Sequence, residues 1–272
     1  MLAVDGTTLD VADTPANQAA FGRPATHRGE RTAFPQVRVV AVAEGGTHAL
    51  IDAAMGPLAK GETTLATGLL TEDGALREGV LLLADRLFVD ATLWRTAAST
   101  GAQLVWRTKS NAVLPVLENF DDGSYLSQIS AATDRRHGIA PTVVRVVEYT
   151  LGKDPGRPEG PAPIRLLTTI LDPAQAPAAE LAALYHQRWE FETTLDELKT
   201  HQRGPKVVLR SKTPELVAQE VWAHLLVHHA IRTLMHQAAL DHQVDPDRLS
   251  FTRSLRVVRR QVTTTGQAAI PP

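Results

Sequence analysis

The chain has 272 residues, 43% of them apolar, and no cysteine. This length supports one large domain, or one domain with an insert, and the lack of cysteine excludes disulfides and thiolate metal sites. Because no run of eighteen apolar residues and no charged-then-apolar leader occurs, we expect neither a membrane span nor secretion. The net charge of −2 is uneven: residues 1–100 carry 8 basic and 12 acidic side chains, whereas residues 185–272 carry 12 and 9.

Strand and helix signals alternate along the first 107 residues. A very short strand over residues 2–4 leads directly to Asp5, and residues 37–43 and 48–54 form a hairpin around Gly45-Gly46. We then expect a helix or connecting segment over 61–70, a strand over 80–83, a helix over 90–100 that stops at Gly101, and a strand over 103–107. This alternation predicts an α/β core in three layers.

Residues 108–171 interrupt the alternation with a β-rich stretch. Its strand signals fall at 113–117, 124–129, 142–150 and 164–171, separated by a turn at 121–123 and a Gly/Pro-rich loop at 152–163. A helix over 178–201 follows. A second helix begins at Thr213 as N-cap, has Pro214 in its first turn and continues to about residue 241.

The helix predicted over 178–201 carries four polar groups at a notable spacing. Tyr185, Arg188, Glu192 and Lys199 fall at offsets 0, 3, 7 and 14, within about 60° of one another on an α-helix. Arginine, lysine and the tyrosine hydroxyl suit a phosphate, whereas a carboxylate suits a hard metal ion. The alternative is an ordinary surface ion pair between Arg188 and Glu192, worth a few tenths of a kcal/mol.

Other groups are weaker candidates. On the same helix Glu190 and Glu197 point to the far side, and Asp196 lies closer to the face that carries Glu192. His224 and His228 have zinc-ligand spacing without an evident third ligand. A basic tail of Arg253, Arg256, Arg259 and Arg260 is typical of a solvated face, although it would also suit a phosphate backbone.

The spacing Tyr-x2-Arg-x3-Glu-x6-Lys resembles the signature of the bacterial DDE transposases of insertion sequence family four. Two more segments are similar to that family: Val-Asp-Gly-Thr-Thr-Leu at 4–9, and Leu-Leu-Leu-Ala-Asp-Arg-Leu-Phe at 81–88. In the second segment Leu87 stands where the family usually has glycine. The resemblance covers about residues 2–262.

The resemblance implies an RNase H-like three-layer core with a β-rich insertion between the second catalytic aspartate and the catalytic glutamate. The core would comprise residues 1–107 and 172–272, and the insertion residues 108–171. Asp5, Asp85 and Glu192 would be the catalytic residues and would bind two Mg²⁺ ions, with Mn²⁺ as a substitute. Tyr185, Arg188 and Lys199 would bind the DNA phosphodiester.

The resemblance also implies a function: metal-dependent DNA cleavage and strand transfer of an insertion sequence. The partner would be double-stranded DNA, both the transposon ends and the target. The candidate assembly is a homodimer in the synaptic complex. The expected location is the bacterial cytoplasm, with the protein associated with the nucleoid when it is bound to DNA. Since Met1 stands only four residues before Asp5, we expect a catalytic core without the N-terminal end-recognition domain of full-length relatives. The alternative is an inactive or inhibitory DNA-binding remnant of a transposase.

Overall fold

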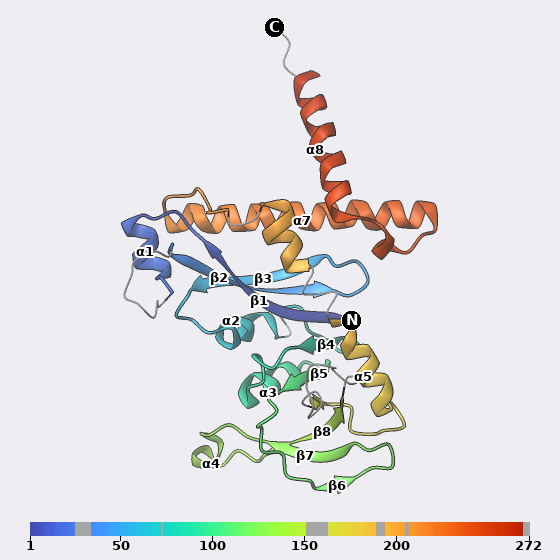
Figure 1. Ribbon diagram of the computed structural model, residues 1–272. Helices are drawn as coiled ribbons and strands as arrows, with labels where there is room; N and C mark the ends of the chain where they lie inside the picture. The colour runs from blue at the N-terminus through green and yellow to red at the C-terminus, as the bar shows by residue number, and fades with distance from the viewer. Residues whose placement is uncertain (25–33, 72, 151–162, 189–193, 205–206, 269–272) are drawn as a thin grey trace, which may run out of the picture. The chain divides into compact units, whose positions relative to one another are not determined.

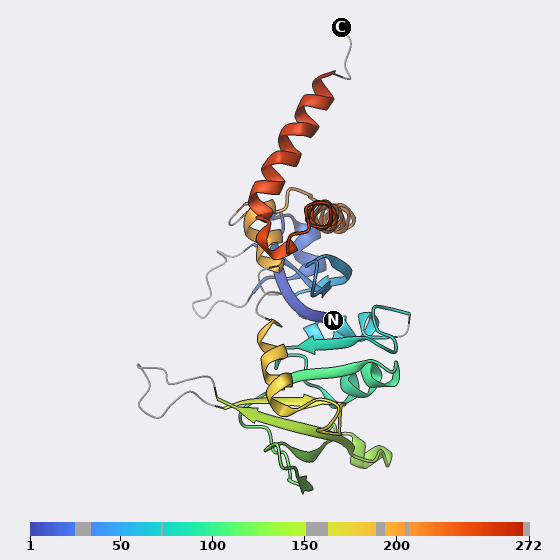
Figure 2. The ribbon, with the colours of Figure 1, turned by 90° about the vertical axis from the view of Figure 1, so that its right-hand side faces the viewer.

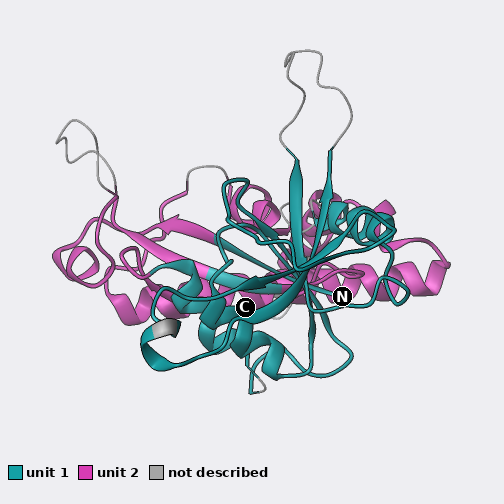
Figure 3. Cartoon of the chain, turned by 90° about the horizontal axis from the view of Figure 1, so that it is seen from below, with its two compact units in different colours: residues 1–6, 40–42, 61–189 teal, residues 7–39, 43–60, 190–272 magenta. Residues whose placement is uncertain are grey.

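The computed structural model describes residues 1–24, 34–71, 73–150, 163–188, 194–204 and 207–268. The chain divides into two compact units, coloured separately in Figure 3, and each unit is built from several segments. Unit 1 comprises residues 1–6, 40–42 and 61–189, and unit 2 comprises residues 7–39, 43–60 and 190–272. Strands β1 (Leu2–Asp10) and β2 (Gln36–Glu44) contribute residues to both.

The sheet of unit 1 begins with three parallel neighbours, β1, β4 (Leu81–Ala84) and β5 (Gln103–Thr108). Their register aligns Val4 with Ala84 and Ala84 with Trp106. Beyond β5 the sheet continues with four antiparallel strands in the order β9 (Ile164–Thr168), β8 (Thr142–Tyr149), β7 (Tyr125–Ile129) and β6 (Glu118–Asn119). Strand β4, with the sequence LLLA, is short and wholly apolar, which is typical of a strand covered on both faces.

Helices cover both faces of this sheet. Figures 1 and 2 show α3 (Ala91–Ser99) and α5 (Ala178–His186) on opposite sides of it. Asp90 caps α3 by accepting hydrogen bonds from the backbone N–H groups of Thr92 and Leu93. On the inner face of α3, Trp94 meets Trp106 edge-to-face at 5.1 Å between ring centroids. Unit 1 also contains α2 (Glu62–Leu69) and α4 (Asp134–His137).

Unit 2 pairs strands in the order β3 (Leu50–Pro57), β2 and β1, and adds α1 (Pro15–Phe21), η1 (Glu197–Gln202), α7 (Pro214–His242), η2 (Pro246–Arg248) and α8 (Phe251–Ala268). Helix α7 packs against β3, and Nδ1 of His229 lies 2.9 Å from the Leu50 carbonyl oxygen. Phe251 and Leu255 of α8 form a buried cluster with two residues of α7, Ile231 and Met235. This cluster fixes which edge of α8 faces the protein.

Most elements expected from the sequence are confirmed, including the hairpin, the strands that became β4, β5, β7, β8 and β9, and helices α3 and α7. The strand expected over 113–117 is wrong: no strand forms there among the described residues, Pro115 interrupts the segment, and Val113 is 91% exposed. The first strand is also longer than expected. It continues from Asp5 to Asp10 because Thr7 and Leu9 alternate inward and are buried.

The predicted division at residues 107 and 171 stays a prediction. In the structure the strands between those positions do not form a separate sheet, since β9 pairs with β5 and extends the sheet of unit 1. Among the helices that the structure describes, none combines the length and apolar character needed to cross a membrane.

Candidate active site

Two of the expected acidic residues lie side by side in unit 1. Val4 and Ala84 are register partners on parallel strands, so the next residues, Asp5 and Asp85, are neighbours at the same level of the sheet, about 4.8 Å apart between strands. Gly6 N–H donates to Oδ1 of Asp5 at 2.8 Å, and Arg86 N–H donates to Oδ1 of Asp85 at 2.5 Å. Both aspartates are partly exposed, so their carboxylates remain within reach of a ligand.

A basic residue occupies the same level on the third parallel strand. Trp106 is the register partner of Ala84, so Arg107, the next residue of β5, lies beside Asp85 just as Asp5 does on the other side. Arg107 was not singled out from the sequence, because cross-strand register is not visible along one strand. Its sequence signal is its place at the end of the strand predicted over 103–107.

Tyr185 reaches this edge of the sheet from α5, but its hydroxyl has a protein partner. The Tyr185 hydroxyl donates a 3.2 Å hydrogen bond to the carbonyl oxygen of Ala84, directly before Asp85, and the side chain is only 4% exposed. Burial raises the pKa of the Tyr185 phenol well above its ordinary value; the Asp85 carboxylate adds to the shift, and Arg188 and Arg107 oppose it. Tyr185 is therefore a neutral hydrogen-bond donor that fixes the backbone next to Asp85.

Arg188 lies against Tyr185. Its guanidinium carbon is 5.5 Å from the centroid of the Tyr185 ring, a cation–π distance, and the residue is 4% exposed. Burial raises the pKa of Tyr149 as well, and the positive charges of Arg107 and Arg188 oppose that shift too. The guanidinium groups of Arg107 and Arg188 therefore both lie near this pair of tyrosines.

A further acid lies beside the first aspartate. A Cβ atom added at Gly6 would meet the carboxyl carbon of Glu62 at 2.5 Å and its oxygens at 2.7 and 2.8 Å. A side chain at position 6 would therefore have to shift the flexible end of Glu62, so the carboxylate of Glu62 lies close to the backbone next to Asp5. Glu62 was not singled out from the sequence, where it is only the first residue of a short helix.

The helix expected over residues 178–201 is wrong as a continuous α-helix. Helix α5 ends at His186, Gln187 is its C-cap, and η1 is a π-helix. Because π-helical hydrogen bonds span five residues, the angular positions calculated for an α-helix do not apply to Lys199. Glu192 lies outside the described residues, so its predicted role stays a prediction. Lys199 belongs to unit 2 and lines a polar cavity there, described below.

The donor set fits a hard divalent cation, as far as the described residues extend. Carboxylate oxygens are the ligands that such ions prefer, and Asp5 and Asp85 present two carboxylates on adjacent strands. Within the described part of the chain, no group of three or more histidine, cysteine, aspartate or glutamate side chains is arranged to hold a metal. A complete site would need a ligand in addition to these two aspartates, which is the role predicted for Glu192.

The weaker candidates have other environments. His228 is fully buried with Nε2 3.3 Å from the Glu197 carboxylate, and the carbonyl group of His224 accepts a hydrogen bond from Gln202. The arginine-rich tail forms α8, in which Arg259 donates to the carbonyl oxygen of Gln202. Trp222 is 43% exposed on α7.

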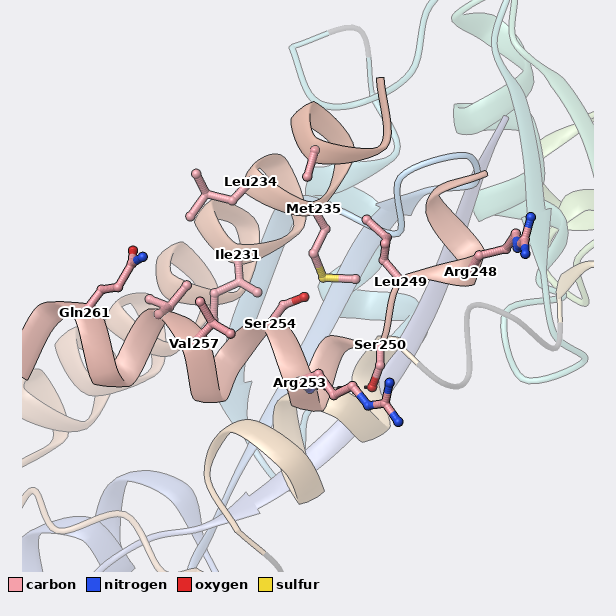
Figure 4. Close-up of a pocket in the computed structure, with 12 residues that line it drawn as sticks. Ile231, Leu234, Met235, Arg248, Leu249, Ser250, Arg253, Ser254, Val257 and Gln261 are labelled. Atoms are coloured by element: carbon pink, nitrogen blue, oxygen red, sulfur yellow. Dashed lines mark hydrogen bonds between the residues drawn. The ribbon is translucent and has the colours of Figure 1, made fainter. Parts of the chain in front are cut away.

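Unit 2 also contains an apolar cavity of about 480 Å³ between α7 and α8. Figure 4 shows Ile231 and Met235 pointing into this space, while the guanidinium groups of Arg248 and Arg253 point away from it. Neither a carboxylate nor any of the predicted site residues lines the cavity. It therefore offers no ligand set for a hard cation.

The two aspartates lie at the ends of parallel strands, with arginines and a buried tyrosine around them. This arrangement is typical of sites for metal-assisted phosphoryl transfer. The family model described as the transposase DDE domain matches residues 1–229. The chain is 31% identical over 273 residues to the transposase InsG for insertion sequence element IS4 of Escherichia coli K12, covering 97% of this chain and 59% of that protein. The chain belongs to the transposase DDE domain family, among the DDE transposases of insertion sequence family four.

A solved structure shares the fold. The piggyBac transposase, in a synaptic complex with hairpin DNA, matches 99% of this chain and 54% of its own chain with a TM-score of 0.58 and 11% sequence identity. At that identity the likeness concerns the fold alone. The chain therefore spans somewhat more than half the length of both proteins.

Proposed function

We propose that this chain is a DDE-type transposase that cleaves duplex DNA and transfers the cut strand. The observation that carries the proposal is the parallel register that brings Asp5 and Asp85 together at the ends of their paired segments. Membership of the transposase DDE domain family supports it independently. We further propose an RNase H-like core, supported by a strand–hairpin–helix–strand order in which β1 lies parallel to β4.

In this proposal Asp5, Asp85 and Glu192 hold divalent cations, with Mg²⁺ as the physiological ion, Mn²⁺ as a substitute and two ions per site. Bound ions would compensate charge at the attacking and leaving oxygens of the phosphodiester. Arg107 and Arg188 offer positive charge to a phosphate beside Asp85. Tyr185 holds the backbone at Ala84 and so keeps the Asp85 carboxylate in place.

The partner in this proposal is double-stranded DNA, both transposon ends and target, with a homodimer as the candidate synaptic assembly. The experiment that tests the function is nicking of supercoiled plasmid with Mg²⁺ or Mn²⁺. Asp85→Asn removes one negative charge with little change of shape, so nicking should be abolished and the melting temperature retained. Asp73→Asn makes the same chemical change at an exposed aspartate and should cleave like the wild type. Persistent cleavage by the Asp85 variant would place the site elsewhere.

A further inference from the structure

Unit 2 contains a polar cavity of about 390 Å³ that Lys199 lines together with residues not predicted to belong to a site. The cavity is lined by residues of β1, β2, η1 and the segment after η1, among them Thr8, Asp10, Gln36, Lys199, Thr200 and Arg203. Asp10 already accepts a 2.8 Å hydrogen bond from Gln36, and Thr200 donates to Asp196 at 2.6 Å. The cations that line the cavity, Lys199 and Arg203, outnumber its single carboxylate.

The charge of Arg203 is only partly compensated. One terminal nitrogen donates to the Val207 carbonyl oxygen at 2.6 Å, whereas the buried Nε atom has no hydrogen-bond partner among the described residues. Burial lowers the pKa of the Arg203 guanidinium from its ordinary value, and the carboxylates of Glu220 and Asp10 oppose that shift. A half-buried cation with an unsatisfied donor is a site that an anion with several acceptor oxygens would stabilise.

The turn that carries Lys199 is held at both ends by buried contacts. At its start the Glu197 carboxylate accepts from Nη2 of Arg232 at 2.6 Å and from Nε at 3.1 Å. At its end Gln202 donates to the His224 carbonyl oxygen at 2.8 Å and accepts from Arg259 at 2.7 Å. Single π-helical turns are rare and are frequently found at functional sites. These anchors keep Lys199 and Arg203 at the same cavity.

We propose that this cavity binds a phosphate group of the DNA backbone, with Arg203 as a second cation beside Lys199 and with Glu197 and Arg232 as positioning residues. The inference rests on the proposed function, because it takes DNA as the source of the phosphate. Arginine suits this ligand because its planar donors match phosphate oxygens. The anchors act through the π-helical turn without touching the ligand.

The test measures binding of the full chain to a fluorescent duplex over a series of salt concentrations. Arg203→Gln should weaken binding about ten- to a hundredfold at low salt, the loss typical of one charged hydrogen bond. The slope of log K against log salt should fall by about 0.9, the value for one phosphate contact. Arg77→Gln removes the same charge from an exposed residue outside the cavity and should leave both quantities unchanged.

A second pair of variants separates positioning from folding. Arg203→Lys keeps the charge and should restore the salt slope. Glu197→Gln weakens the contact with Arg232 and keeps both Lys199 and Arg203. If that contact positions Arg203, adding Arg203→Gln to the Glu197→Gln variant should reduce DNA affinity less than Arg203→Gln does in the wild type. Additive losses would overturn the positioning role, and wild-type affinity and slope in a folded Arg203→Gln variant would overturn the site.

Inorganic phosphate distinguishes the source of the ligand. Phosphate that competes with DNA in the wild type, and no longer competes in the Arg203→Gln variant, supports the backbone assignment. Stabilisation by phosphate that depends on Arg203, together with unchanged DNA affinity of the variant, would assign the cavity to a free phosphate and overturn the proposal. If the Arg203→Gln variant keeps the wild-type DNA affinity and salt slope while Asp85-dependent nicking persists, the inference fails and the proposed function stands.

Discussion

Asp5, Asp85 and Arg107 owe their proximity to the register of three strands. Each follows a residue paired with its neighbours, and the pairs connect Val4 to Ala84 and Ala84 to Trp106. The two aspartates could be selected from the sequence because their local segments resemble family blocks. Arg107 could not, since nothing within residues 103–107 states which residue of another strand lies opposite.

The hydrogen bond from Tyr185 to Ala84 supports a prediction at the same scale. Tyr185→Phe removes this buried bond, so the free energy of unfolding should fall by about 1 kcal/mol, and the rate of nicking should fall further than the affinity for DNA. Urea unfolding and single-turnover cleavage measure the two effects. Tyr125→Phe is the control, because the Tyr125 hydroxyl donates to Glu148 at an exposed site where water can replace it. Equal effects of both substitutions would contradict the role assigned to Tyr185.

Leu87 departs from the family pattern without requiring an unusual backbone conformation. The residue stands where the family usually has glycine, yet among the described non-glycine residues only His48 and Gln243 have positive φ. Leu87 is exposed in the turn closed by the bond from Phe88 N–H to the Asp85 carbonyl oxygen. The turn after β4 therefore needs no glycine at this position.

At the scale of elements, the segment between Ala178 and Gln202 departs most from the sequence prediction. Its apolar spacing correctly predicts helix, and α5 forms at its start. The same spacing cannot reveal a π-helical turn, because η1 is fixed by contacts of Glu197 with Arg232 on α7, which is remote in sequence. Tertiary contacts decide the helix type here.

Two histidines of α7 should make stability depend on pH. Burial lowers the pKa of His228 and of His224 from the ordinary value of 6.5; Glu197 opposes the shift of His228, and Arg232 and His229 add to it. The unfolded state therefore binds more protons than the folded state just below pH 6.5, so stability should decline as pH falls from 7 to 5. Urea unfolding at these pH values is the measurement. His228→Gln should flatten the decline, and an unchanged slope would assign it to other groups.

The attachment of α8 to α7 leads to another prediction for this part of the fold. Phe251 is buried in the cluster with Ile231 and Met235 and stacks on His228 at 5.1 Å. Phe251→Ala should lower the free energy of unfolding by about 3–5 kcal/mol. Val262→Ala, on an exposed part of the same helix, should change it by about 0.5 kcal/mol or less. Thermal and urea unfolding of the two variants would reveal whether α8 is part of the cooperative structure.

At the scale of the molecule, the overall charge predicts how the chain binds DNA. A net charge of −2 provides no general attraction to a polyanion, so binding should depend on a few local cations. We expect non-specific affinity of about 10⁻⁴–10⁻⁶ M at physiological salt. Fluorescence anisotropy with random duplex and with the ends of the element, at one salt concentration, measures it. A hundredfold preference for the ends, about 2.7 kcal/mol, would show sequence-specific contacts within this chain.

For the whole fold, too, features set by neighbouring residues could be predicted from the sequence, whereas features set by contacts between remote segments could not. Alternating strand and helix signals indicated the α/β class, which the mixture of strands and helices in the structure confirms. The division into two interleaved units could not be predicted, because the boundary between them passes through the middle of β1 and β2. No change of composition marks those positions.

This interleaving has a consequence for synthesis on the ribosome. The chain passes from one unit to the other five times, and residues 7–39 belong with residues 190–272. At 5–20 residues per second, the early segment must wait on the order of 10–30 s for its later partners to be made. Its apolar residues, such as Val37, Val39 and Leu9, are buried only in the finished fold. Neither unit can therefore be completed before most of the chain has been made, and a frameshift after residue 60 would deprive both units of parts at once.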